Sequence, residues 1–271
     1  MYVPSEVKNI TVSTLQKMKA DGEKFAVLTA YDSSFAHQQG LAGVEVLLVG
    51  DSLGMVVQGK DSTIPVTIDE MAYHTACVAK GRQGSLVMAD MPFMGCQTLE
   101  ATLQNATKLM QAGAHMVKLE GEAWLAEHIE SLARGGIPVC AHMGLTPQSV
   151  HKFGGYKIQG RDQQAADQMI QDALAVQEAG AAILLVECIP SVLGKTLSET
   201  LDIPVIGIGA GSDCDAQVLV MHDMIGVTPG KPAKFVRNFL ADGITTVPEA
   251  FEAYVKAVKD GSFPGPEHCF V

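Results

Sequence analysis

Three stretches of the chain decide its fold: LAGVEVLLVGD (41–51), QAGAHMVKLEG (111–121) and EAGAAILLVEC (178–188). In each of them an Ala-Gly pair marks the end of a helix, because glycine readily adopts the left-handed conformation that closes a helix C-terminus. An apolar run then follows and ends beside an acidic residue. Helices that alternate with buried apolar strands are typical of parallel sheets. We therefore expect a repeated strand–helix unit.

Eight apolar runs of this kind occur along the chain. Each is short and rich in Val, Ile and Leu, which is typical of strands buried on both faces. The runs are FAVLTA (25–30), VEVLLVG (44–50), SLVMAD (85–90), HMVKLE (115–120), IPVCAH (137–142), AILLVE (182–187), PVIGIG (204–209) and QVLVMH (217–222). Segments with helical spacing lie between most of them, for example 68–82, 98–112, 123–134, 162–179 and 190–201. The spacing of the units is too irregular for a stacked solenoid.

Eight strands with intervening helices predict a (β/α)8 TIM barrel of α/β class, formed by residues 1–271 as a single domain. An amphipathic helix within residues 1–22 would cap the bottom of the barrel, and a C-terminal helix is expected at 247–259. The gap between Gly209 and Gln217 is too short for a full crossover helix, so either that helix is a single turn or one strand is misassigned. A doubly wound open sheet is the alternative, but GIGAGS (207–212) lacks the third glycine of the dinucleotide-binding fingerprint.

The composition excludes several classes of protein. The chain has 271 residues, of which 47% are hydrophobic, so it can bury a core and is not disordered. Its 19 Lys+Arg and 30 Asp+Glu give a net charge of −11, and without a basic stripe we expect no nucleic-acid partner. No apolar run approaches the roughly 18 residues of a membrane span. MYVPSEVKNI at the N-terminus has no signal-peptide core, and the six cysteines form no CxxC pair. We therefore expect a cytoplasmic protein with no membrane partner.

Polar side chains stand where most of the predicted strands end, and that end of a (β/α)8 barrel carries the active site. They are Asp32, Asp51, Ser52, Asp90, Lys118, Glu120, His142, Glu187, His222 and Asp223. A single acid at a strand end commonly caps the next helix. Several carboxylates on one rim repel one another, however, and a site that tolerates them usually holds a cation.

Three of these acids, Asp51, Asp90 and Glu120, are candidate ligands of a metal ion. Because the chain has no cysteine pair and no His-x-x-x-His spacing, the ligands would all be oxygens, which suits Mg2+. Lys118 lies two residues before Glu120 and therefore projects from the same face of its strand. A lysine inside a barrel needs a charged partner. It either contacts an anionic substrate or forms a structural salt bridge.

Glu187 and His142 are candidates for acid–base chemistry. Glu187 follows the apolar run AILLV, and a carboxylate with apolar neighbours can serve as a general base. A buried ion pair with a lysine is an equally good interpretation. His142 in CAHMG could be a base, an electrophile or a hydrogen-bonded core side chain.

Two loops are unusually long and rich in glycine: DSLGMVVQGKDSTIPVT (51–67) and GLTPQSVHKFGGYKIQGR (144–161). Loops of this length commonly serve as lids or binding walls. The alternatives are plain surface excursions or contacts between subunits.

Seven motifs together resemble one known family. VGDSLGMVVQGKDSTIPVT, ADMPFM, MVKLEG, CAHMGLTPQSV, FGGYKIQGR, LLVEC and VIGIGAG appear in this order along the chain. They closely resemble the ketopantoate hydroxymethyltransferase family, with a match from about residue 10 to the C-terminus. The long loops match as well as the strands, and the positions that carry the chemistry show no departure.

The resemblance implies a (β/α)8 barrel of the phosphoenolpyruvate/pyruvate superfamily. It also implies transfer of a hydroxymethyl group from 5,10-methylenetetrahydrofolate to 3-methyl-2-oxobutanoate, giving ketopantoate for pantothenate biosynthesis. Mg2+ would be held through Asp51, Asp90 and Glu120. The oxo acid would lie around Asp51, Ser52, Asp90 and Lys118, with Glu187 as proton acceptor. Members of the family form homo-oligomers, and we expect a decamer of five dimers.

Two other functions are compatible with such a barrel. One is a lyase of the same superfamily that cleaves a C–C bond in an oxo or hydroxy acid, although the mobile cysteine-bearing loop of such lyases has no convincing equivalent here. The other is a non-catalytic barrel for binding or assembly, which gives no reason for so many acids on one rim.

Overall fold

The predicted strands close into one parallel barrel in the computed structural model, which describes residues 9–241 and 243–271. The strands are β1 (Phe25–Thr29), β2 (Val46–Val49), β3 (Leu86–Asp90), β4 (Met116–Glu120), β5 (Val139–Gly144), β6 (Ile183–Glu187), β7 (Val205–Ile208) and β8 (Ala216–Leu219). Each strand pairs with the next, and β8 pairs with β1 from Phe25↔Ala216 to Leu28↔Leu219. The doubly wound alternative is therefore wrong, because it leaves the sheet open.

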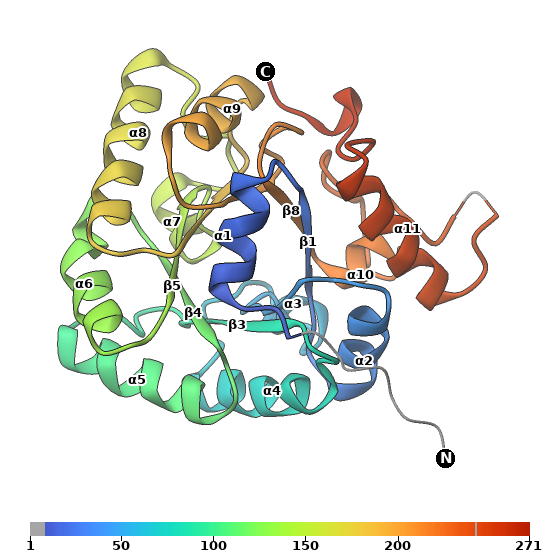
Figure 1. The fold of residues 1–271 in the computed structure, drawn as a ribbon, viewed down its shortest axis with the longest axis horizontal. Helices are drawn as coiled ribbons and strands as arrows, with labels where there is room; N and C mark the ends of the chain where they lie inside the picture. Colours follow the sequence, from blue (N-terminus) through green and yellow to red (C-terminus); the bar gives the residue numbers. More distant parts are fainter. Residues whose placement is uncertain (1–8, 242) are drawn as a thin grey trace.

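Helices surround the barrel wall, as Figure 1 shows. They include α2 (Ser33–Leu41), α4 (Ile68–Gly81), α5 (Leu99–Gln111), α6 (Ala126–Arg134), α8 (Gln163–Glu178), α9 (Ser191–Thr200) and α11 (Val247–Lys259). The five predicted helical segments and the C-terminal helix are confirmed, with ends shifted by at most a residue or so. The segment 123–134 begins with a 3-10 turn, η1 (Ala123–Leu125). Thr98 and Asp162 are N-caps, because their side chains accept from backbone N–H groups of the first turn.

The connection between β7 and β8 explains the short gap at Gly209–Gln217. Both strands are real, and the connection, residues 209–215, contains no helix. It packs directly on α9, where a Cβ atom at Gly194 would lie 2.2 Å from the carbonyl oxygen of Ala210. Lys24 Nζ also donates to the carbonyl oxygens of Ser212 and Cys214. A glycine in the neighbouring helix therefore allows a bare loop to replace the crossover helix.

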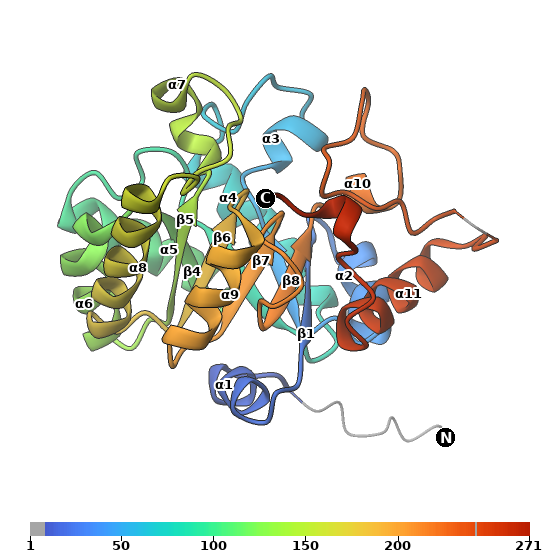
Figure 2. The ribbon, with the colours of Figure 1, turned by 90° about the horizontal axis from the view of Figure 1, so that it is seen from above.

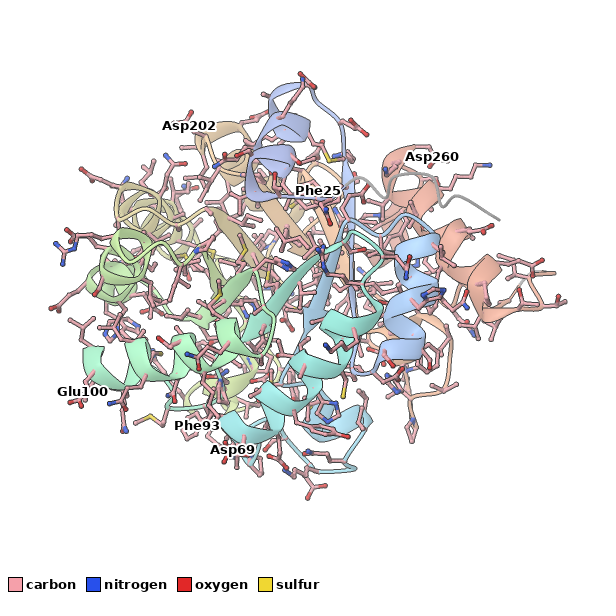
Figure 3. All side chains as sticks on the ribbon, turned by 60° about the horizontal axis from the view of Figure 1, so that its bottom comes forward. Phe25, Asp69, Phe93, Glu100, Asp202 and Asp260 are labelled. Carbon is pink, nitrogen blue, oxygen red and sulfur yellow. The ribbon has the colours of Figure 1, made fainter. Side chains whose placement is uncertain are left out.

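Helix α1 (Val12–Ala20) closes the N-terminal end of the barrel. Its Leu15 and Met18 belong to the apolar cluster inside the barrel, together with Phe25 of β1. Figure 2 shows α1 at the end opposite α3 (Leu53–Val56) and α7 (Val150–Phe153). In Figure 3 Phe25 lies near α1, whereas Asp69, Glu100, Asp202 and Asp260 lie at the periphery. The predicted helix at the bottom of the barrel is thus confirmed as α1. Residues 1–8 of the predicted segment 1–22 lie outside the described part of the chain.

The two long loops reach the end of the barrel opposite α1, but they are not wholly irregular. Segment 51–67 contains α3, and segment 144–161 contains α7 and the 3-10 turn η2 (Pro147–Ser149). Segment 217–222 also differs from expectation, because β8 ends at Leu219 and the short helix α10 (Met221–Met224) follows. In the described ranges 9–241 and 243–271, every helix is too short or too polar to cross a bilayer.

Candidate active site

Polar side chains occupy the inward positions at the C-terminal ends of four neighbouring strands. Side chains alternate between the two faces of a strand. Met116 and Cys140 face into the barrel, and so do the residues two places further on, Lys118 and His142. The inward polar set at the barrel mouth is Asp90, Lys118, Glu120, His142 and Glu187. These polar side chains therefore continue the row of inward-facing core residues along each strand, and they do not lie on the outer surface of the barrel.

The strand register sets these side chains beside one another. Asp90 pairs with Lys118 between β3 and β4, and Glu120 pairs with His142 between β4 and β5. Lys118 Nζ lies 2.9 Å from Asp90 Oδ1 and 4.0 Å from Glu120 Oε1. It also lies 3.2 Å from His142 Nδ1. All four side chains are buried, so the ammonium group is enclosed by polar groups and shielded from solvent.

His142 lies between two carboxylates. Its Nδ1 atom is 3.4 Å from Glu120 Oε1, and its Nε2 atom is 3.3 Å from Glu187 Oε2. Burial and then the charge of Lys118 lower the pKa of His142, so the ring is neutral at neutral pH. Because an ammonium group can only donate, Nδ1 accepts from Lys118 and the ring proton is on Nε2. That N–H group lies 3.3 Å from Glu187 Oε2, but it makes no hydrogen bond among the described residues.

Asp51 and Ser52 reach the same site from the loop after β2. The backbone N–H of Asp51 donates to Asp90 Oδ2 at 3.0 Å. The hydroxyl groups of Ser52 and the buried Tyr31 share a hydrogen bond of 2.9 Å. These two contacts fix the start of the loop to the ends of β1 and β3.

All six residues predicted for the site line one cavity of about 1250 Å³ at the C-terminal ends of the strands. They are Asp51, Ser52, Asp90, Lys118, Glu120 and Glu187. Parts of both long loops form the wall, together with Phe270 near the C-terminal end of the chain. The carbonyl of Phe270 accepts from the backbone N–H of Ser191 at 3.0 Å. The structure therefore brings the predicted residues together, while their individual roles remain predictions.

The other polar residues predicted at strand ends have different positions. Asp32 is the N-cap of α2, accepts from two backbone N–H groups of its first turn, and does not line the cavity. His222 and Asp223 lie in α10, because β8 ends before them. Asp223 lines the cavity, whereas the ring of His222 packs against Tyr31 with centroids 5.4 Å apart.

Burial of several acids in one place raises their pKa values. Burial first, and then the negative charges of Asp90 and Glu120, raises the pKa of Asp51 well above its ordinary value. Burial also raises the pKa of Asp90 and of Glu120, although the positive charge of Lys118 opposes it. For Lys118, burial favours a lower pKa, but the surrounding carboxylates outweigh it and the pKa is raised. Within this buried cluster, one ammonium group thus faces three carboxylates.

The donor set fits a hard divalent cation such as Mg2+, because its members are carboxylate oxygens. Glu120 Oε1 is buried without a hydrogen-bond donor among the described residues, because the nearby Nδ1 atom of His142 carries no proton to donate to it. A cation would satisfy this oxygen and offset the excess negative charge. Within the described ranges, no three His, Cys, Asp or Glu side chains are close enough to enclose an ion. Metal binding by these acids therefore stays a prediction.

Two contributors to the site, Tyr31 and Gln148, are absent from the sequence prediction. Tyr31 supports Ser52, and Gln148 donates hydrogen bonds to Asp51 and Glu120. Both are uncharged and neither ends a strand, so the pattern of acids at strand ends does not include them. The only available signal was the position of Gln148 inside the motif CAHMGLTPQSV.

Several solved structures have a similar fold. A putative phosphonomutase from Burkholderia cenocepacia J2315 has a TM-score of 0.65 at 16% identity, covering 80% of this chain and 96% of that chain. Phosphonopyruvate hydrolase in complex with oxalate and Mg++ has a TM-score of 0.60 at 12% identity, covering 78% and 80%. 2,3-Dimethylmalate lyase, of the PEP mutase/isocitrate lyase superfamily, has a TM-score of 0.55 at 14% identity, covering 94% and 99%. At these identities the likeness shows the fold alone.

Comparisons of the sequence identify the family more specifically than the fold does. A protein from Marinomonas sp. (strain MWYL1) named 3-methyl-2-oxobutanoate hydroxymethyltransferase is 62% identical over 97% of this chain and 95% of its own length. A protein of the same name from Alcanivorax borkumensis is 60% identical over 97% of this chain and all of its own length. The sequence profile described as Ketopantoate hydroxymethyltransferase matches residues 9–266. With this barrel and these matches, the chain belongs to the ketopantoate hydroxymethyltransferase family.

Proposed function

We propose that the protein transfers a hydroxymethyl group from 5,10-methylenetetrahydrofolate to 3-methyl-2-oxobutanoate and so forms ketopantoate. The observation that carries the proposal is the presence of Glu187 and a buried Asp90–Lys118 pair in one cavity. This arrangement provides a carboxylate for proton removal and a fixed positive charge for an anionic substrate. The names of relatives 62% and 60% identical also support it.

Proton removal must come first, because the carbon next to the ketone becomes a nucleophile only after it loses its hydrogen. Glu187, whose carboxylate lies 3.3 Å from Nε2 of His142, takes the proton from C3 of the oxo acid. The negative charge then spreads onto the keto oxygen, where Lys118 offers a positive charge. The C3 atom forms a bond to the one-carbon unit of the folate, both C–N bonds that hold this unit break, and water supplies the hydroxyl oxygen. The two folate nitrogens take up the proton removed from C3 and the remaining proton of the water.

The other acids at the mouth would hold the metal ion and the oxo acid. We assign Asp51, Asp90 and Glu120 to Mg2+ and place the substrate around Ser52 and Lys118. When bound, the ion would supply further positive charge beside the keto and carboxylate oxygens. Its presence would also account for three buried carboxylates that share a single ammonium group.

The size of the cavity supports a second, larger substrate. Its volume of about 1250 Å³ exceeds the roughly 300–1,000 Å³ of pockets for drug-sized ligands. A five-carbon acid at the floor of the cavity would leave most of this space free. We assign the free space between the two long loops to the folate.

Replacement of the base tests this proposal most directly. Glu187→Gln keeps the size of the side chain but removes the proton acceptor. We expect a ~10²- to 10⁴-fold slower exchange of the C3 hydrogen of the oxo acid for deuterium, measured by proton NMR in D2O without folate. Calorimetry should show nearly unchanged binding of the oxo acid. Glu199→Gln on α9, outside the cavity, serves as the matched control. Exchange by Glu187→Gln at the wild-type rate would show that Glu187 is not the base.

A further inference from the structure

Gln148 is hydrogen-bonded to two acids from different segments of the barrel mouth. Its side-chain Nε2 donates to Asp51 Oδ2 at 2.8 Å and to the carbonyl oxygen of Met91 at 2.9 Å. Its backbone N–H donates to Glu120 Oε2 at 3.0 Å. The loop after β5 thus holds one acid from the end of β4 and one from the loop after β2.

The local backbone explains why this residue can reach both acids. Gln148 is the central residue of the 3-10 turn η2. The first N–H groups of such a turn have no partner within the turn, so that of Gln148 is free to donate to Glu120. The two N–H groups of the side-chain amide are both used, by Asp51 and by Met91, which fixes the orientation of the amide.

These bonds use only one oxygen of each carboxylate. Glu120 Oε1 is buried and accepts no hydrogen bond, while Oε2 is held by Gln148. Asp51 likewise accepts from Gln148 through Oδ2, which leaves Oδ1 for another partner among the groups at the mouth. Both residues line the main cavity. Gln148 therefore fixes two acids without satisfying either of them completely.

We propose that Gln148 is a positioning residue, which holds Asp51 and Glu120 so that each keeps one oxygen available to a divalent cation. The proposal rests on the proposed function, because that function assigns the metal to these acids. It makes the loop 144–161 part of the metal site as well as part of the cavity wall. Loss of a hydrogen bond that orients a metal ligand typically weakens metal binding by ~10- to 100-fold.

The test compares metal affinity in three proteins that are first freed of metal with EDTA. Gln148→Leu removes both amide donors but leaves the backbone N–H. Gln159→Leu is the matched control, because Gln159 lies in the same loop and its amide donates only to the carbonyl of Lys157. Isothermal titration with Mg2+, and electron paramagnetic resonance with Mn2+, give the dissociation constants. We expect a ~10- to 100-fold higher constant for Gln148→Leu and no change for Gln159→Leu.

A purely structural role would give a different result. If Gln148 served only the stability of the loop, Gln148→Leu would lower the midpoint of thermal unfolding without metal and would leave the metal dissociation constant unchanged. Equal metal affinity of wild type and Gln148→Leu would therefore overturn this proposal alone. Wild-type protein that binds no metal, or binds it equally well after Asp51→Asn, would overturn the metal assignment in the proposed function and this proposal with it.

Discussion

The hydroxyl group of Tyr31 supports the site from the segment that follows β1. It shares a 2.9 Å hydrogen bond with Ser52, which is predicted to contact the substrate. Burial raises the pKa of Tyr31, so the phenol stays protonated through neutral pH and keeps a hydrogen to share. Its ring also packs on His222. A tyrosine at this position thus links α10 to the loop after β2.

Tyr31→Phe should therefore affect binding more than chemistry. The change removes only the hydroxyl group, and one hydrogen bond contributes about 0.5–1.5 kcal/mol. We expect KM for the oxo acid to rise ~2- to 10-fold, with a smaller change in kcat. Steady-state kinetics would measure both, and Tyr73→Phe on the exposed side of α4 is the control. A fall in kcat with unchanged KM would contradict a role through Ser52.

The acids of the site could be predicted because they obey a pattern. They stand at or just after the ends of strands, and all strands of a parallel barrel end at the same side. Tyr31 and Gln148 could not be predicted in this way. Their contribution depends on hydrogen bonds across 21 residues to Ser52 and across 97 residues to Asp51, and such contacts arise only when the barrel closes.

The turn at the end of β5 needs a glycine next to the proposed base. Gly144 has φ = +85°, and a Cβ atom there would lie 2.4 Å from the backbone oxygen of Glu187. Gly144 and Glu187 are also direct partners across β5 and β6. A side chain at this position would therefore push β6 away and displace Glu187.

Gly144→Ala should reduce both stability and activity. Left-handed backbone costs about 1–2 kcal/mol for alanine, and the steric overlap adds roughly 1–3 kcal/mol. Urea unfolding should show both costs, and the deuterium exchange assay should show slower proton removal. Gly136→Ala is a matched control, because φ is +83° there but no atom lies within 4 Å of its Cβ. That variant should lose some stability and no activity; equal activities of the two variants would refute the steric argument.

At the scale of elements, the sequence predicted whether a segment is a helix or a strand better than it predicted where the segment ends. Apolar runs revealed the strands because both faces of the barrel wall are buried. The assignment of residues 220–222 to the last strand was wrong. Apolar Val220 and Met221 continue the run of the strand in the sequence, but the chain turns into α10 there. The connection between β7 and β8 could not be predicted, since it depends on Gly194, which lies outside the connection and makes room for it.

The two ends of the barrel have separate tasks, and stability can therefore be changed without changing activity. Leu15 of α1 is fully buried against the inner core, at the end away from the site. Leu15→Ala should lower the free energy of unfolding by about 2–5 kcal/mol, as is typical of buried leucines. Urea unfolding would measure this loss, and kcat at 25 °C should stay unchanged. Lys17→Ala on the exposed side of α1 is the control. A large fall in kcat for folded Leu15→Ala would show that α1 and the mouth are coupled.

The assembly of the whole molecule remains a proposal. We propose a decamer of five dimers, as the family resemblance implies. Phe93, Met94 and Trp124 are exposed apolar side chains that a subunit contact could cover. Sedimentation velocity should then give a mass of about 287 kDa, ten times the 28.7 kDa of the chain. A species of 28.7 kDa at micromolar concentration would contradict the decamer.

The position of Phe270 in the cavity wall has a practical consequence. Its carbonyl is tied to the start of α9, so the last residues of the sequence run beside the opening through which substrates enter. An affinity tag or fluorescent fusion joined after Val271 would begin at that opening and compete with ligands for space. Helix α1 lies at the far end of the barrel, so immobilisation through its exposed side would leave the opening clear.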